Sequence, residues 1–156
     1  MVCSALKNSG TDEQKAEWLP RIAAGEIACF GLTEPGSGSD SAAMATTAKR
    51  DGDSYIVNGA KTFITSGMRA DFITIAVRTG EPGLGGLSLL VIEADTPGLD
   101  RTPLSKMGWQ CSDTATLYFD NCRIPKENVL LGPSGFKKQI SGFNVERLGN
   151  SARAVS

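Results

Sequence analysis

The residues best suited to chemistry lie at positions 30–40 (FGLTEPGSGSD), where an apolar run enters a turn of small residues. Gly36 and Gly38 permit backbone conformations and a close approach that a Cβ atom would block. Successive amides in such a turn, with the hydroxyl groups of Thr33 and Ser39 beside them, form a cradle for an anion. A phosphorylated or oxyanionic ligand therefore fits this turn; an ordinary polar loop capped by an aspartate is the alternative.

The residue types around this turn exclude several familiar sites. No Gly-Lys-Ser/Thr follows it, so it is not a P-loop, and it is not a Gly-x-Gly-x-x-Gly turn that opens a helix. The chain has 0 histidines, which removes Ser-His-Asp and Cys-His nucleophile systems and imidazole bases. Acid–base chemistry must then use carboxylate, Lys, Tyr or Cys.

The cysteines Cys3, Cys29, Cys111 and Cys122 show no Cys-x-x-Cys spacing. This pattern argues against a zinc ribbon or a thioredoxin-type site, so no metal site is expected. We interpret them as four free thiols in a reducing compartment.

The charge balance limits the possible partners. The 156 residues carry 16 Lys+Arg and 17 Asp+Glu, a net charge of −1, which argues against nucleic acid or a membrane surface as the general partner. The longest apolar run, 87–92, is too short to span a bilayer, and the N-terminus does not read as a signal peptide. With 40% hydrophobic and 21% charged residues, the composition is that of a globular chain able to bury a core.

The elements that position the turn begin with a helix from Asp12 to Leu19, where Thr11 and Gln14 fit a capping box. Pro20 is expected to interrupt this helix. A further turn follows it, and Gly25 ends that turn.

Short strand-like runs then alternate with turn residues. The runs are 27–33, 45–50, 54–58, 61–66, 72–78, 87–93 and 115–119. Asp51-Gly52 predicts a hairpin, and Asn58-Gly59 predicts a turn between two strands. Seven or so short strands at this spacing indicate a β-sandwich or barrel, and no α-helix of useful length fits between residues 40 and 130.

Helical spacing returns after the Gly-Pro-Ser-Gly sequence at 132–135, with apolar residues at Phe136, Ile140, Phe143 and Leu148. The chain thus has helices at both ends of a β-rich middle. We interpret it as a middle domain with the ends of two helical domains; two helices packed on a barrel are the alternative.

Several segments in register resemble the flavin-dependent acyl-CoA dehydrogenases. They are 31–43 (GLTEPGSGSDSAA), 55–67 (YIVNGAKTFITSG), 91–98, 106–114 (KMGWQCSDT), 129–132 and 144–147 (NVER). The resemblance implies a mainly β fold, a barrel like the middle domain of that family with short helices at both ends. It implies the end of an N-terminal helical domain at 1–26, the barrel at 27–131 and the start of a C-terminal helical domain at 132–156.

The resemblance also implies a binding site for FAD. Phe30 and Leu32 lie on the strand beside the flavin pyrimidine, and the Thr33 hydroxyl contacts it. The pyrophosphate contacts are Gly38 and Ser39. In the second segment the flavin contacts are Phe63, Ile64 and Thr65, with Phe63 where the family often has tryptophan and the Thr65 hydroxyl on flavin N5.

For the substrate, the resemblance implies that Ser39, Asn144 and Arg147 contact the acyl-CoA. Asn144 departs from the aspartate common at its position. Glu146 matches the catalytic base of the family members that carry it in the helix after the barrel. Two alternatives stay open: Glu146 has a structural role, or the base lies beyond Ser156.

The implied function is FAD-dependent α,β-dehydrogenation of an acyl-CoA to the 2-enoyl-CoA, in fatty acid or amino acid catabolism. The expected partners are an electron-transfer flavoprotein and further copies of the chain, as a dimer or homotetramer, in the bacterial cytoplasm or the mitochondrial matrix. An isolated chain of this length is expected to bind FAD weakly and turn over poorly. An acyl-CoA oxidase or flavin monooxygenase on the same barrel, and a non-catalytic flavin- or CoA-binding module, are the alternatives.

Overall fold

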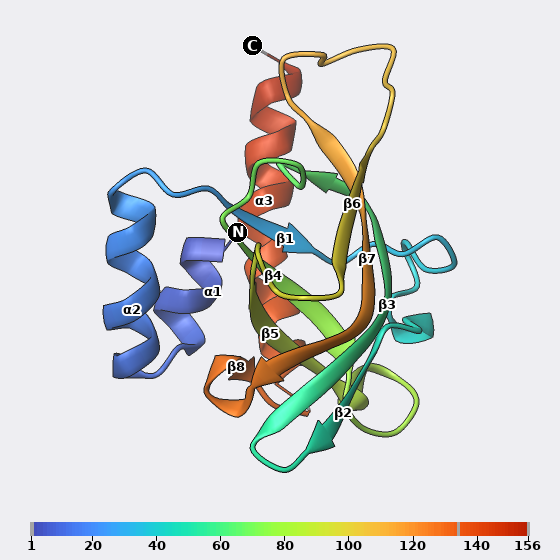
Figure 1. Cartoon of the computed structure of the whole chain (residues 1–156). Coiled ribbons are helices and arrows are strands. Elements are labelled where there is room, and N and C mark those ends of the chain that lie inside the picture. Colours follow the sequence, from blue (N-terminus) through green and yellow to red (C-terminus); the bar gives the residue numbers. More distant parts are fainter. Residues whose placement is uncertain (1, 134, 156) are drawn as a thin grey trace.

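One curled sheet forms the body of the protein, with helices packed on its outside (Figure 1). The computed structural model describes residues 2–133 and 135–155 and, within the last helix, only some of the side chains. The strands are β1 Ala28–Gly31, β2 Thr47–Asp51, β3 Ser54–Thr65, β4 Phe72–Arg78, β5 Leu87–Glu93, β6 Leu99–Pro103, β7 Thr114–Pro125 and β8 Val129–Leu131. Their order is β6-β7-β3-β2-β4-β5-β8, and β1 pairs in parallel with β4. The mainly β fold predicted from the sequence is confirmed.

The helices are α1 Val2–Ser9, α2 Asp12–Ala23 and α3 Phe136–Ala154, and short 3₁₀ turns lie at η1 Ser41–Ala43, η2 Leu84–Gly86 and η3 Lys126–Asn128. Between residues 40 and 130 only the 3₁₀ turns are helical, as predicted. The helix predicted after residue 135 is present as α3. Four free cysteines were also predicted correctly.

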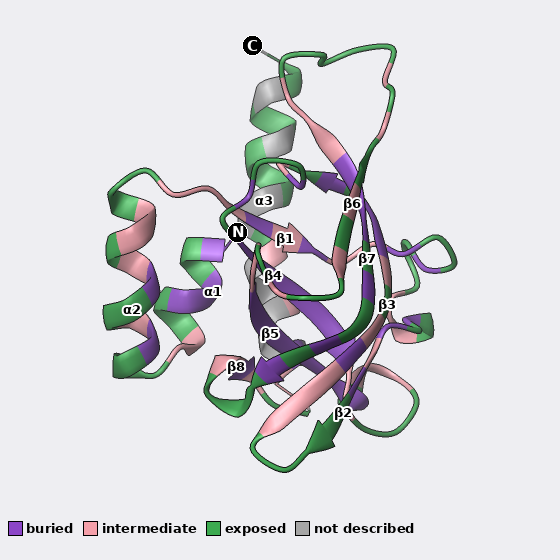
Figure 2. Cartoon of the chain, viewed as in Figure 1, coloured by how far each residue is buried: buried purple, intermediate pink, exposed green. Residues whose placement is uncertain are grey.

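The central strands β4 and β5 are buried on both faces (Figure 2). Ile73, Ile75 and Val77 enter the core enclosed by the sheet. Their neighbours Phe72 and Ala76 enter a second core under the helices. Burial on both faces explains why these strands are continuous apolar runs in the sequence rather than alternating ones.

The hairpin at Asp51-Gly52 is confirmed, since β2 pairs antiparallel with β3. The turn predicted at Asn58-Gly59 is wrong, because β3 runs through it and its register against β7 shifts there. Gly59 has φ +143°, and a Cβ atom on it would lie 2.6 Å from the Thr46 hydroxyl oxygen. These residues form a bulge at which another segment approaches the strand.

Helix α2 has the predicted capping box of Thr11 and Gln14. It does not break at Pro20 but continues to Ala23. The proline removes one backbone hydrogen bond near the helix end. Packing offsets this loss, because Trp18 is buried with its ring 4.8 Å from that of Phe72.

Candidate functional site

The turn that follows β1 is joined to β3 directly ahead of Phe63. The amide of Thr62 donates a hydrogen bond to the Thr33 carbonyl at 2.8 Å. The ammonium group of Lys61 donates to the Leu32 carbonyl at 3.2 Å. The two stretches predicted to bind flavin therefore meet on one wall of the barrel.

A buried ion pair lies beneath this junction. Lys61 Nζ is 2.7 Å from Glu34 Oε1. Burial lowers the pKa of Lys61 to about 8, against the opposing effect of Glu34. Burial pushes the pKa of Glu34 upward, but hydrogen bonds from Lys61 and Thr46 outweigh it, so this pKa lies below its ordinary value. At pH 7 both groups are charged.

The same Glu34 carboxylate organises the segment that leads into β2. It accepts hydrogen bonds from the amides of Ala45 at 2.7 Å and Thr46 at 3.0 Å. Glu34 thus joins three parts of the chain: the turn, the segment before β2, and β3 through Lys61. The sequence gives no sign of these roles of Glu34 and Lys61, because nothing in the spacing of the two residues shows that they meet.

The turn itself is closed by short-range hydrogen bonds. Glu34 and Ser37 exchange backbone hydrogen bonds of 2.8 and 3.2 Å, and the Ser37 hydroxyl donates to the Asp40 carbonyl. Within the described part of the chain, no acceptor is bound to the amide of Gly38 or Ser39. Two exposed, unpaired donors at the end of a turn are what an anion requires.

The glycines of this turn act differently from the prediction. Neither Gly36 nor Gly38 has a positive φ, so the turn does not need their conformational freedom. A Cβ atom at either position would meet no heavy atom within 4 Å. The space beside them is open, which fits the close approach of a ligand.

Phe63 lies on a bulge of β3 with its ring in solvent. It has φ +58° and its side chain is 70% exposed, and the register with β7 shifts between Lys61 and Ile64. A left-handed backbone at a non-glycine residue costs about 1–2 kcal/mol. Thr65 is exposed beside it, whereas the Ile64 side chain lies in the core. Ile64 as a whole is 2% exposed and its carbonyl already accepts from the Gly67 amide at 3.1 Å, so this predicted flavin contact is not presented to a ligand as Phe63 and Thr65 are.

A cavity of about 230 Å³ brings Ser39 and Arg147 together, although they are far apart in the sequence. Its walls are the turn at 39–42, Leu84 of η2, and Phe143 on α3. The Phe143 ring also meets the edge of Phe30 on β1, with 6.3 Å between centroids. The predicted pyrophosphate contact and the predicted substrate arginine thus share one cavity.

Two further site residues were predicted on α3, Asn144 and Glu146, and the structure describes the side chain of only the first. Asn144 is exposed, and its Oδ1 accepts a hydrogen bond from Arg147 Nη1 at 2.7 Å. Asn144 therefore orients the guanidinium. The side chain of Glu146 lies outside the described residues, so only its position on α3 is known.

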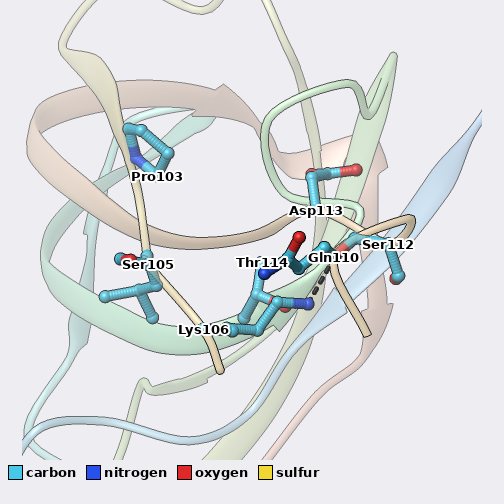
Figure 3. Close-up of a pocket in the computed structure, with 8 residues that line it drawn as sticks. Pro103, Ser105, Lys106, Gln110, Ser112, Asp113 and Thr114 are labelled. Carbon is cyan, nitrogen blue, oxygen red and sulfur yellow. Dashed lines mark hydrogen bonds between the residues drawn. The ribbon is translucent and has the colours of Figure 1, made fainter. Parts of the chain in front are cut away.

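A second cavity, of about 290 Å³, lies beside the loop between β6 and β7 (Figure 3). Lys106 Nζ donates to the carbonyls of Trp109 and Ser112 inside this loop. Asp113 joins the loop to the turn after Thr65, because its carbonyl accepts from the Ser66 amide at 3.0 Å. The loop therefore supports the far end of the Phe63–Thr65 segment.

Among the described residues, no three Cys, Asp or Glu side chains gather as metal ligands would. In the same residues no helix has both the length and the apolar character needed to cross a membrane.

Comparison with known proteins decides the family. A family model described as "Acyl-CoA dehydrogenase, middle domain" matches residues 29–122. The chain belongs to the acyl-CoA dehydrogenase family. The match covers the barrel strands from β1 into β7, so the resemblance read from the sequence motifs is confirmed.

Relatives in this family resemble the chain over nearly its whole length. The mitochondrial isobutyryl-CoA dehydrogenase of Dictyostelium discoideum is 46% identical over 87% of this chain and 32% of its own. A solved probable acyl-CoA dehydrogenase from Mycobacterium abscessus is 49% identical with a TM-score of 0.90, over 93% of this chain and 39% of that one. A glutaryl-CoA dehydrogenase from Mycobacterium smegmatis, solved in complex with FADH2, is 39% identical with a TM-score of 0.84, over 92% of this chain and 37% of that one. The chain thus spans between about a third and two fifths of the length of these relatives.

Proposed function

We propose that this chain forms the flavin- and CoA-binding core of an FAD-dependent acyl-CoA dehydrogenase. The observation that carries the proposal is the shared cavity of Ser39 and Arg147 beside unpaired turn amides. The guanidinium suits the phosphates or the thioester oxygen of an acyl-CoA, and the free amides beside it suit the pyrophosphate of FAD. The family and the FADH2-bound relative support the choice of ligands.

FAD suits the wall where the turn meets β3. The amides of Gly38 and Ser39, with open space beside Gly38, suit a pyrophosphate. The exposed ring of Phe63 and hydroxyl of Thr65 offer a flat apolar contact and a hydrogen bond to the ring system. Bound FAD would supply the hydride acceptor, a redox capacity that amino-acid side chains lack.

The chain's own residues would bind and deprotonate the substrate. Ser39 and Arg147 hold the acyl-CoA in the cavity, and Asn144 keeps the guanidinium in place. Glu146 on the same helix is the proposed base that removes the α-proton, a task suited to a carboxylate in a chain without histidine.

We further propose domains at 1–26, 27–131 and 132–156, with helical parts on either side of the barrel. An electron-transfer flavoprotein would accept the electrons, and copies of the protein would assemble as dimers or tetramers. The bacterial cytoplasm and the mitochondrial matrix are the proposed locations. A mitochondrial relative supports the second of these.

Titration of the purified chain with FAD and with butyryl-CoA, followed by calorimetry, tests the proposal. We expect saturable but weak binding of both ligands, and little turnover with a dye as electron acceptor. Replacing Arg147 by Gln should weaken butyryl-CoA binding and leave FAD binding intact, with Arg50→Gln on the β2–β3 hairpin as the control. If the unmodified chain failed to bind FAD, or failed to bind butyryl-CoA, the result would contradict the proposed function.

A further inference from the structure

Arg78 at the end of β4 connects two loops that no strand pairing joins. Its Nη2 donates to the Ala42 carbonyl at 2.7 Å and its Nε to the Met44 carbonyl at 3.1 Å. Its Nη1 donates to the carbonyls of Glu81 at 2.8 Å and Gly83 at 3.1 Å. One planar guanidinium group thus binds four backbone carbonyl oxygens, two on each loop.

These two loops are walls of the cavity that contains Ser39 and Arg147. Ala42 lines it from the turn side, and Leu84, directly after Gly83, lines it from the other side. Helix α3 closes the third side with Phe143. Arg78 is not among the lining residues, so its effect on the cavity acts through the loops that it holds.

The chemistry of this contact explains why an arginine stands there. All four acceptors are backbone carbonyls, and among the described residues no carboxylate forms an ion pair with Arg78. A guanidinium offers five N–H donors in a fixed plane, whereas an ammonium group acts as a point charge. Lysine could therefore keep the charge but not span both loops.

The segment from Ala42 to Thr46 is held from both sides by charged groups. Arg78 binds its carbonyls at Ala42 and Met44, while the carboxylate of Glu34 binds the amides of Ala45 and Thr46. Charge-assisted hydrogen bonds are about twice as strong as neutral ones. These contacts act together with the buried Met44 side chain and with the backbone hydrogen bond from the Arg78 amide to the Thr46 carbonyl at 2.8 Å, and so help to fix where this segment lies.

We propose that Arg78 is a positioning residue for the acyl-CoA substrate. By joining the carbonyls of Ala42 and Gly83 it sets the separation of the two loop walls, and so the fit of the CoA thioester between them. This inference rests on the proposed function. The proposed flavin-ring contacts Phe63 and Thr65 lie on β3, away from these walls, whereas the proposed pyrophosphate contact Ser39 lies on the wall that contains Ala42. Loss of Arg78 should therefore weaken acyl-CoA binding more than FAD binding.

The test compares Arg78→Gln and Arg78→Lys with Arg50→Gln. Arg50 also donates from its guanidinium to a backbone carbonyl, that of Gly52, but on the exposed β2–β3 hairpin. Calorimetry gives the dissociation constants of butyryl-CoA and of FAD for each variant. Hydrogen exchange of the backbone, followed by mass spectrometry, reports on segments 41–46 and 81–86.

We expect both Arg78 variants to weaken butyryl-CoA binding by about tenfold, since small displacements of positioning groups are costly, and to weaken FAD binding clearly less. Exchange should rise in both segments while β4 and β5 stay protected, and the Arg50 variant should match the unmodified chain. Unchanged butyryl-CoA affinity, or equal loss of both ligands, would overturn the role of Arg78 alone. An unmodified chain that binds FAD but no butyryl-CoA would instead overturn the proposed function, and with it this inference.

Discussion

The ammonium nitrogen of Lys61 lies 2.7 Å from a carboxylate oxygen of Glu34, and the two side chains are 0% and 4% exposed. This pair joins the turn after β1 to the strand that carries Phe63. A buried pair of this kind is costly to break, because the partner left behind keeps a charge that is buried and unpaired. It therefore maintains the geometry of the proposed flavin wall.

Replacing Lys61 by Met should destabilise the protein by about 3–5 kcal/mol, because Glu34 is left charged and buried. The double variant with Glu34→Gln should recover part of that loss, since no charge then remains. Urea denaturation of both single variants and the double variant measures the coupling. Lys126→Met, which breaks the exposed pair with Asp53, is the control and should cost less than about 1 kcal/mol.

Stability should depend on pH through Lys61. Burial lowers its pKa from 10.5 to about 8, so between these values the unfolded chain binds more protons than the folded one. Stability therefore rises with pH across this window. We expect the free energy of unfolding of the unmodified chain minus that of Lys61→Met to increase as the pH is raised from 8 to 10.5. A flat or falling difference would contradict the lowered pKa.

The strained backbone at Phe63 predicts an inverted preference between glycine and alanine. Phe63→Gly should be more stable than Phe63→Ala by about 1 kcal/mol, because a left-handed φ is strained for alanine but not for glycine. The neighbouring Thr65 lacks a positive φ, so at this position Thr65→Ala should be more stable than Thr65→Gly. Thermal unfolding gives the order. Both Phe63 variants should bind FAD more weakly, and full retention of affinity would remove the ring from the flavin site.

Gly59 should not tolerate a side chain. Gly59→Ala places a Cβ atom 2.6–2.8 Å from Thr46, and overpacking of this kind costs about 1–3 kcal/mol. Gly108→Ala, where a Cβ atom meets open space, is the matched control and should change stability little. Equal midpoints for the two variants in urea would show that the strand moves away from Thr46 without cost.

The proposed base predicts an exchange reaction that needs no electron acceptor. The α-hydrogens of butyryl-CoA should exchange with deuterated water in the presence of the chain, and Glu146→Gln should slow this by about 10²-fold or more. Proton NMR measures the exchange. Glu127→Gln, at an exposed carboxylate of η3, is the control. Exchange at the full rate in Glu146→Gln would assign the base elsewhere.

Local patterns in the sequence were sufficient to predict most helices and strands and to identify the family. The Thr11–Gln14 capping box, the Asp51-Gly52 hairpin and the apolar runs of β4 and β5 each depend on neighbouring residues, so one sequence reveals them. Errors arose where tertiary packing outweighed a local signal. Pro20 lies inside α2, and Asn58-Gly59 forms a bulge rather than a turn.

Tertiary structure alone decided which distant residues meet. The approach of the turn after β1 to β3 brings Lys61 to Glu34, and the packing of α3 on η2 brings Arg147 to Ser39. Arg78 gives no sign in the sequence that it joins two loops. Such contacts depend on the closure of the barrel and on where long side chains reach, and neither is encoded in the spacing of residues along the chain.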